Sequence, residues 1–370
     1  MARLSPFKGI RYNPNRISSM ADVVSPPYDV ISEAEQAGLH DRNPFNVIRM
    51  ELGQKRPGDG KHDNPHTRAR DYLRTWLEDG TLIQEETPAV YLTATEFGTV
   101  NGTYTRWGLV VSVGLEPFSE GGILPHERTY SKVKSERLAL MRTCRANLSP
   151  IFAFFSDDQS TMPLLISHVA QIPPEIAFQD DNQHIHKMWL IKDPDLHALI
   201  TANFKQQTLF IADGHHRYET ALAYRDELAA LEKGLPENHP ANNVLMYLSS
   251  IQDPGLMILP AHRLLPEIPQ DVRCQFLEQA RSYFKIQLPE ESMTQEQGIN
   301  ALLARLEQAQ PGAALVVALR DAETPVLLQL KSGGKATIYP EETPDVLKDV
   351  DVTLLTLSLI HISEPTRPTT

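Results

Sequence analysis

The chain has 370 residues, of which 41% are hydrophobic and 22% charged, a composition typical of a globular protein with room for two or three cores. Its formal net charge of −12 argues against a general nucleic-acid binder, because such proteins take much of their affinity from a basic surface. The longest apolar runs are far shorter than a membrane span, the N-terminus lacks a signal-peptide pattern, and Cys144 and Cys274 have no CxxC partner. We therefore expect a cytoplasmic protein with reduced thiols and with no nucleic-acid or membrane partner, and the sequence leaves the oligomeric state open.

The first 120 residues predict an N-terminal α+β lobe. The motif ADVVSPPYDV suggests a strand and a rigid turn, and Ser32 with Glu35 forms a capping box for a short helix. NPFNVIRMELG predicts a loop and a strand, after which a polar loop leads to a helix that carries Tyr72 and Trp76 on one face. The dipeptide Asn101-Gly102 between two β-rich runs predicts a hairpin.

Residues 121–250 predict a central core with an insertion. A basic helix is expected from about Ser131 to Arg145, followed by strands in IFAFF and HIHKMWLIKD and a helix begun by Pro194. Leu209–Ala212 then reads as a buried strand, DGHHR as a tight turn, and the following residues as a helix that stops at Gly234. NNVLMYLSSI predicts one more buried strand. We interpret the basic helix as a local anion-binding face, formed by Lys132, Lys134, Arg137, Arg142 and Arg145.

Residues 251–356 predict a C-terminal α+β lobe with helices over 271–284 and 294–310 and strands in AALVVALRD, TPVLLQLKS and ATIYP. No turn signal separates the last residues, 357–370, from the helix predicted before them. LSLIHISEPTR within them resembles the translation of a transposase adapter used in sequencing libraries. We expect a non-native tail there. A genuine disordered C-terminus is the alternative.

Two motifs carry residues suited to chemistry, LPHERT and ADGHHRY. A carboxylate beside a histidine in a loop can act as a general base, and Asp213 at a strand end is well placed to bind Mg2+ or to orient a histidine. The glycine after it permits a close backbone approach, and the next three side chains and the helix N-terminus can donate to phosphate oxygens. These are parts for phosphoryl transfer. The candidate catalytic residues are Glu127, Asp213 and His126; the candidate phosphate-binding residues are Gly214, His215, His216 and Arg217; Asp213 is also the candidate Mg2+ ligand.

Less specific interpretations stay open for both motifs. Adjacent histidines in a turn can be a solvated helix start, and a His-Glu pair in a loop is often only surface. A structural zinc site is a further possibility, because an HxH pattern on a strand puts both rings on one face, although HExxH and CxxC spacings are absent. Its ligands would come from His184, His186, His215 and His216.

The motifs SPPYDV, NPFNVIR, LPHERT, RLALMRTCRANLSPIFAFF, IADGHHRYETAL and LPAHRLL resemble, in order, those of the domain of unknown function 1015 family, up to about Leu355. That family has no settled activity. The pair PHE and DGHHR is also similar to motifs of the free L-serine kinases, which share the ParB/sulfiredoxin fold. This second resemblance implies that Glu127 is the base for the substrate hydroxyl, that Asp213 is a metal or serine-side carboxylate, and that residues 214–217 cradle the nucleotide phosphates.

The resemblance implies a mixed α/β (α+β) protein with a ParB/sulfiredoxin-like nucleotide-binding core and additional N- and C-terminal lobes. The implied activity is a Mg2+-dependent kinase that uses ATP or ADP on a small hydroxyl metabolite, with L-serine as the leading candidate. A nucleotide-binding regulator without turnover and a phosphoserine phosphatase-type hydrolase are the alternatives. Two departures accompany the resemblance: 86 positions separate Glu127 from Asp213, more than in the kinases, and their late Pro-Lys-Thr-type segment is missing. Sulfiredoxin chemistry is disfavoured, because its cysteine would fall at His215.

Overall fold

In this computed structural model, the structure describes residues 2–99, 102–125, 131–257, 264, 268–290, 294–310, 312–320, 322, 324–334, 338–339 and 343–355. The chain divides into two compact units, Met1–Met257 and Ile258–Thr370, and both combine helices with strands. The boundary expected at residue 120 does not separate compact units, because strands from both sides of it lie in one sheet. The boundary expected at residue 250 lies near the observed division. The tail, 357–370, falls outside the described residues.

The first unit is organised around a nine-stranded mixed sheet with the order β6-β10-β7-β11-β5-β4-β9-β8 and with β1 also paired to β5. The pairs β6–β10 and β7–β11 are parallel, and the other neighbours are antiparallel. The nine strands are β1 (Leu4–Ser5), β4 (Val90–Thr99), β5 (Gly102–Gly114), β6 (Ile123–Leu124), β7 (Ile151–Phe155), β8 (Ile176–Gln179), β9 (Ile185–Ile191), β10 (Leu209–Asp213) and β11 (Asn243–Ser250). Two further short strands, β2 (Ile10–Tyr12) and β3 (Leu82–Gln84), pair with each other.

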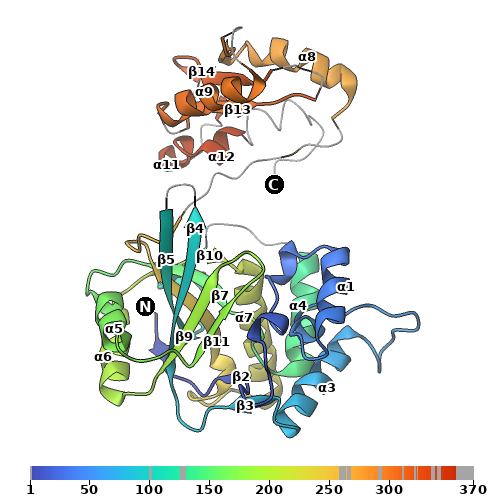
Figure 1. Cartoon of the computed structure of the whole chain (residues 1–370), viewed down its shortest axis with the longest axis vertical. Helices are drawn as coiled ribbons and strands as arrows, with labels where there is room; N and C mark the ends of the chain where they lie inside the picture. The colour runs from blue at the N-terminus through green and yellow to red at the C-terminus, as the bar shows by residue number, and fades with distance from the viewer. Residues whose placement is uncertain are drawn as a thin grey trace. The chain divides into compact units, whose positions relative to one another are not determined.

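The helices of the first unit gather in two groups. Helix α4 packs against α3 and α7, and α1 lies beside them, whereas α5 and α6 lie on the opposite side of the unit (Figure 1). The helices are α1 (Glu33–Arg42), α2 (Ile48–Glu51), α3 (Pro65–Glu78), α4 (Ser131–Cys144), α5 (Thr161–Val169), α6 (Pro194–Phe204) and α7 (His215–Glu232). Within the described part of the chain, none of the helices has the length and apolar character needed to cross a membrane.

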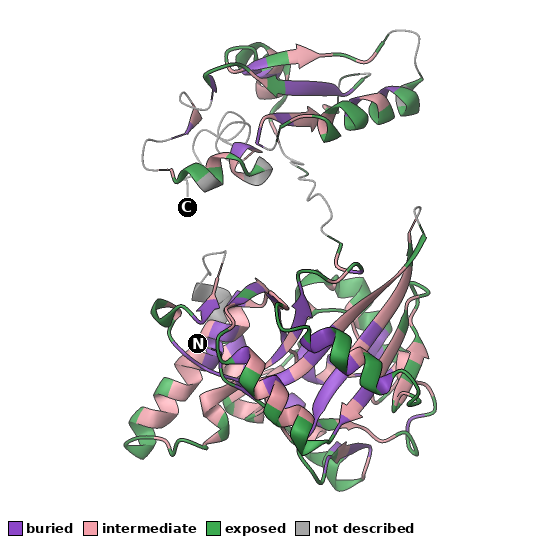
Figure 2. Cartoon of the chain, turned by 90° about the vertical axis from the view of Figure 1, so that its left-hand side faces the viewer, coloured by how far each residue is buried: buried purple, intermediate pink, exposed green. Residues whose placement is uncertain are grey.

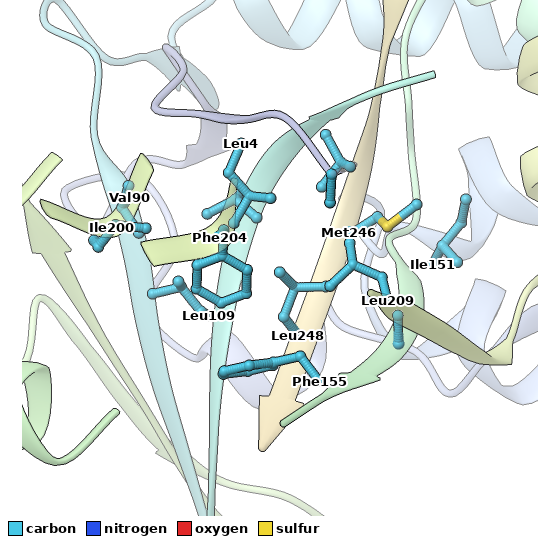
Figure 3. Close-up of a cluster of buried hydrophobic side chains, with 14 of the residues drawn as sticks. Leu4, Val90, Leu109, Ile151, Phe155, Ile200, Phe204, Leu209, Met246 and Leu248 are labelled. Carbon is cyan, nitrogen blue, oxygen red and sulfur yellow. The ribbon is translucent and has the colours of Figure 1, made fainter. Parts of the chain in front are cut away.

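One hydrophobic core joins the sheet to α5, α6 and α7. Figure 2 shows the buried residues concentrated along the strands and exposed residues on the helices and loops around them. In the close-up of Figure 3, Phe155 of β7 and Phe204 of α6 lie among aliphatic side chains such as Leu109 and Leu248, and the two aromatic rings are 4.6 Å apart between centroids. This burial fixes the β10–α7 connection, because Leu209 before the connection and Tyr218 after it belong to the same core.

Two local predictions in the N-terminal segment are wrong. The structure has no strand at Val23, which follows a single 3-10 turn, and NPFNVIRMELG forms the short helix α2 instead of a strand. The buried side chain of Asn46 explains both results. It donates to the carbonyls of Asp22 and Val24 and accepts from the N–H of Ile48, so it holds the two segments together and starts the helix. The capping box at Ser32 and the β4–β5 hairpin are confirmed.

The second unit contains a three-stranded antiparallel sheet with the order β12-β14-β13. The helix predicted over 271–284 ends at Ala280, because Phe284 begins β12 and is buried in the core of this unit. Three of the five residues of the strand expected in ATIYP lie outside the described residues. The elements are β12 (Phe284–Gln287), β13 (Ala314–Val317), β14 (Val326–Leu330), α8 (Gln270–Ala280), α9 (Gln295–Glu307), α11 (Asp345–Lys348) and α12 (Asp351–Leu354).

Candidate functional site

The DGHHR motif forms the predicted tight turn between β10 and α7. The register of β10 against β7 shifts between Ile211 and Asp213, so a bulge re-aims the end of the strand. Gly214 has φ 96° and ψ 26°, the left-handed conformation that favours glycine. A Cβ atom on Gly214 would also lie only 2.9 Å from Nε of Arg217. Both the backbone conformation and the neighbouring guanidinium therefore require glycine here.

Among the side chains of the turn, the structure brings Asp213 and Arg217 together. The guanidinium of Arg217 donates to the carboxylate of Asp213 and to the backbone carbonyl of Pro150, which precedes β7. His215 is buried, only 5% exposed, and His216 is half-buried. In this arrangement Arg217 braces the turn against β7, and its positive charge lies beside the carboxylate proposed for Mg2+.

Tyr28 of the SPPYDV motif lies between two arginines. The guanidinium carbon of Arg137 is 3.9 Å from the centroid of the Tyr28 ring, and that of Arg217 is 6.0 Å from it. Both distances are within the range of a cation–π contact. Burial raises the pKa of the Tyr28 hydroxyl, although the two arginines oppose this shift. The phenol is therefore neutral at physiological pH and can serve as a hydrogen-bond donor next to the DGHHR turn.

Arg137 connects α4 to α2. Its guanidinium donates to the carboxylate of Glu51 at 3.0 Å and to the backbone carbonyl of Glu51 at 3.0 Å, and the two side chains are only 6% and 9% exposed. The expectation of a single anion-binding face along α4 is corrected by Arg142, which forms an exposed ion pair with Glu227 of α7. Arg137 turns toward Tyr28 and Glu51, and Arg145, which follows α4, lines a hollow beside α7. The side chains of Lys132 and Lys134 lie outside the described part of the chain.

A small cavity with both polar and apolar side chains in its wall lies where these elements meet. Its volume is about 40 Å³, and Asn147 and Ser149 of the α4–β7 connection contribute to its wall. Within the described chain, four buried atoms that have no hydrogen-bond partner belong to residues lining this cavity: Oε1 of Glu51, Nε of Arg137, Nε of Arg217 and Oγ1 of Thr220. An unsatisfied buried polar group costs about 1–3 kcal/mol, so the cavity favours a hydrogen-bonding guest. Its volume has room for roughly three water-sized groups.

A larger hollow adjoins this cavity. It measures about 280 Å³ and shares Met141, Ala146 and Asn147 with the small cavity, while Tyr224 and Leu228 of α7 extend it along the helix. Ligand pockets usually measure roughly 300–1,000 Å³, so the hollow is near the lower end of that range. A ligand with a small group and a larger portion would fill both spaces.

The second predicted motif, with His126 and Glu127, lies outside the described residues. The described neighbours of this motif flank the site: β6 precedes it, and α4 with Arg137 follows it. β6 runs parallel to β10, with Leu124 opposite Phe210. Because the carboxyl ends of neighbouring parallel strands meet at one edge of a sheet, the chain leaves β6 at the edge where the DGHHR turn begins.

The four histidines considered for zinc do not form one site. His186 is on β9 and His184 immediately precedes that strand, whereas His215 and His216 follow β10, and four strands separate β9 from β10 in the sheet. At about 4.8 Å per strand the two pairs are roughly 24 Å apart, too far to share an ion.

Sequence reasoning did not identify Tyr28, Glu51 or Thr220 as site residues. Tyr28 belongs to SPPYDV, Glu51 is the second residue after NPFNVIR, and Thr220 belongs to IADGHHRYETAL, so these motifs marked the right segments. The missing information was that the segments converge: α4 packs against α7, and Arg137 of α4 bonds to Glu51 of α2.

A family model described as "Protein of unknown function (DUF1015)" matches residues 4–353 of the chain. The chain matches no curated protein and no solved structure.

Proposed function

The chain belongs to the DUF1015 family, a family of unknown function, so membership does not indicate an activity. From the site itself, we propose that the protein is a nucleotide- and Mg2+-dependent phosphotransferase acting on a small hydroxyl metabolite. L-serine is the leading substrate and ATP or ADP the donor, as the resemblance of the PHE and DGHHR motifs to the free L-serine kinases implies. A ParB/sulfiredoxin-like core and a cytoplasmic location are part of the same proposal.

The observation that carries the proposal is the small cavity beside the DGHHR turn and the unpartnered polar atoms of the residues that line it. Its four unpartnered polar atoms come from two arginines, a threonine and a glutamate, and three of them are donors suited to phosphoryl oxygens. The cavity has the size of a terminal phosphoryl group, and the adjoining hollow of about 280 Å³ offers space for the rest of a nucleotide. Of α7, Arg217 and Thr220 line this cavity. We propose that the N–H groups at the start of the helix bind a further phosphate of the nucleotide.

We infer that nucleotide binding exchanges the partners of one ion pair. The carboxylate of Asp213 and the guanidinium of Arg217 form an ion pair in the structure. On binding, Asp213 would hold Mg2+ and Arg217 would turn to phosphate oxygens, so neither charge is left unpaired. Mg2+ supplies neutralisation of charge on the phosphate oxygens. The Asp213 side chain is 49% exposed, so its carboxylate is open to a metal ion, whereas the Arg217 side chain is only 12% exposed and also donates to the carbonyl of Pro150.

Glu127 would accept the proton of the substrate hydroxyl as that oxygen attacks the terminal phosphorus, and the bond from phosphorus to the nucleotide bridging oxygen would break. A carboxylate is sufficient for this role, because phosphoryl transfer depends mainly on positioning and charge neutralisation. His126 would orient this carboxylate.

The test is to incubate the full chain with L-serine, Mg2+ and either ATP or ADP and to follow O-phosphoserine by phosphorus NMR, while calorimetry measures nucleotide affinity. The parent should form product. E127Q should bind nucleotide with unchanged affinity but form none, and D213N should lose the Mg2+-dependent part of the affinity. D226N is the matched control, because Asp226 is an exposed carboxylate on α7.

Nucleotide binding without product from the parent would overturn the L-serine kinase proposal and favour a nucleotide-binding regulator or a different hydroxyl substrate. Release of phosphate from phosphoserine in place of its synthesis would favour the hydrolase. If nucleotide does not bind at all, the assignment of the cavity is wrong.

A further inference from the structure

The β8–β9 hairpin brings together a carboxylate and two imidazoles far from the DGHHR turn. Asp180, His184 and His186 each present one ligand atom, and these three atoms all lie within 4.8 Å of one another. We propose that this group is a binding site for a divalent transition-metal ion, with zinc as the preferred ion. Two imidazoles and a carboxylate suit zinc and its neighbours in the first transition row better than Mg2+ or Ca2+, which prefer oxygen ligands only.

The distances fit a single ion. Oδ2 of Asp180 lies 2.9 Å from Nε2 of His186 and 3.5 Å from Nδ1 of His184. A tetrahedral zinc ion with ligands at about 2.0–2.2 Å holds them roughly 3.3–3.6 Å apart, so small rotations of the rings would complete the geometry. The three side chains are between 23% and 37% exposed, which leaves a fourth position open to water.

Groups behind the ligands hold them in orientation. Oδ1 of Asp180, the oxygen that is not paired with the imidazoles, accepts the backbone N–H groups of Asn182 and His184, both at 2.9 Å. Nδ1 of His186 lies 3.4 Å from Oγ1 of Thr95 on β4, so a proton on Nδ1 leaves the lone pair of Nε2 for a metal. Metal-bound histidines commonly have such a partner on their other nitrogen.

Aromatic rings pack against the two imidazoles, and the nearby arginine forms its ion pair with a different carboxylate from that of Asp180. The ring of Phe178 stacks on His186 with centroids 4.9 Å apart, and Phe97 meets His184 edge-on at 6.0 Å. The guanidinium of Arg42 pairs with Asp181 at 2.7 Å and not with Asp180. Oδ2 of Asp180 is therefore left to the two imidazoles, while its Oδ1 accepts the backbone N–H groups of the loop.

The first experiment titrates the full chain, freed of metal by a chelator, with ZnCl₂ in a calorimeter. The parent should bind one zinc ion at this site. D180N and H186Q, which each remove a ligand, should weaken that binding by at least ~100-fold, and T95V, which removes only the partner of His186, by ~10-fold. D181N and H168Q are the matched controls, because they change a neighbouring carboxylate and an exposed histidine of α5, and their affinity should equal that of the parent.

Co2+ gives a second readout that does not depend on the heat of binding. The parent should develop a visible absorption band typical of tetrahedral nitrogen and oxygen ligands, and H184Q should not. The proposal is overturned if the parent binds no stoichiometric zinc, or if D180N binds it as tightly as D181N. Circular dichroism of the metal-free variants must match the parent, so that a lost site is distinguished from a lost fold.

Discussion

Gly214 is the single residue on which the geometry of the β10–α7 turn depends most directly. Its left-handed backbone and the closeness of Arg217 act together. A side chain at this position would have to adopt an unfavourable backbone conformation and also displace the guanidinium that braces the turn against Pro150.

We predict that G214A destabilises the chain by at least about 1–2 kcal/mol, the cost of a left-handed alanine, with an added cost from the moved arginine. Urea unfolding measures this. G38A is the matched control: Gly38 lies in α1 with open space around its missing Cβ, so alanine there should be neutral or stabilising by up to about 1 kcal/mol. A G214A chain as stable as the parent would contradict the prediction.

At the scale of elements, α2 and α4 are held together by a buried ion pair. Glu51 ends α2 and Arg137 lies in α4, and both side chains are almost completely removed from water. Charges in such an environment are stable only as a pair, because the lost hydration of each must be offset by the other.

We predict that R137M costs about 3–5 kcal/mol of unfolding free energy, because it leaves the Glu51 carboxylate buried and unpaired. The double variant E51L/R137M should recover a large part of that loss, since it removes both charges. R142M on the same helix breaks only an exposed ion pair with Glu227 and should cost about 0–1 kcal/mol. Equal losses for R137M and the double variant would show that the charge pair is not the cause.

The sequence predicted those elements whose signals are local. The capping box at Ser32, the helix around Trp76 and the strand–turn–helix at DGHHR were all found, because caps, glycines and apolar periodicity lie within the segments themselves. The approach of Arg217 to Asp213 could be anticipated in the same way, since the two residues are four positions apart across the start of a helix.

The sequence could not predict features that depend on distant partners. Helix α2 owes its start to Asn46, whose side chain bonds to carbonyls more than twenty residues away. The domain boundary expected at residue 120 is not seen, because β5 pairs with β11, a strand that lies far along the chain. In the site, the meeting of Tyr28, Arg137 and Arg217 was hidden for the same reason.

At the scale of the whole molecule, the chain divides after Met257 into two units, and the first unit has its own sheet and hydrophobic core. All the described residues of the candidate site and of the β8–β9 hairpin belong to this unit. Its core includes residues from β1 to β11, so it does not need the second unit to close its sheet.

We predict that residues 1–257 fold alone, with a single cooperative urea transition. A shorter chain, 1–242, should fail to fold, because it lacks β11, which lies between β5 and β7 in the sheet. Circular dichroism and the urea transition measure both. The prediction is wrong if 1–257 is unfolded or if 1–242 folds as well as 1–257.

The position of β11 also affects how the protein folds during its synthesis on the ribosome. β5 and β7 emerge early, yet the strand that joins them begins only at Asn243. Between Phe155 and Asn243 roughly 90 residues are added, which at about 5–20 residues per second takes on the order of 4–18 s. For that time the nascent chain carries two unpaired sheet edges rich in valine and phenylalanine, the kind of surface that aggregates or recruits chaperones. A central strand made last thus makes translation speed and chaperone supply, as much as final stability, determinants of the yield of folded protein.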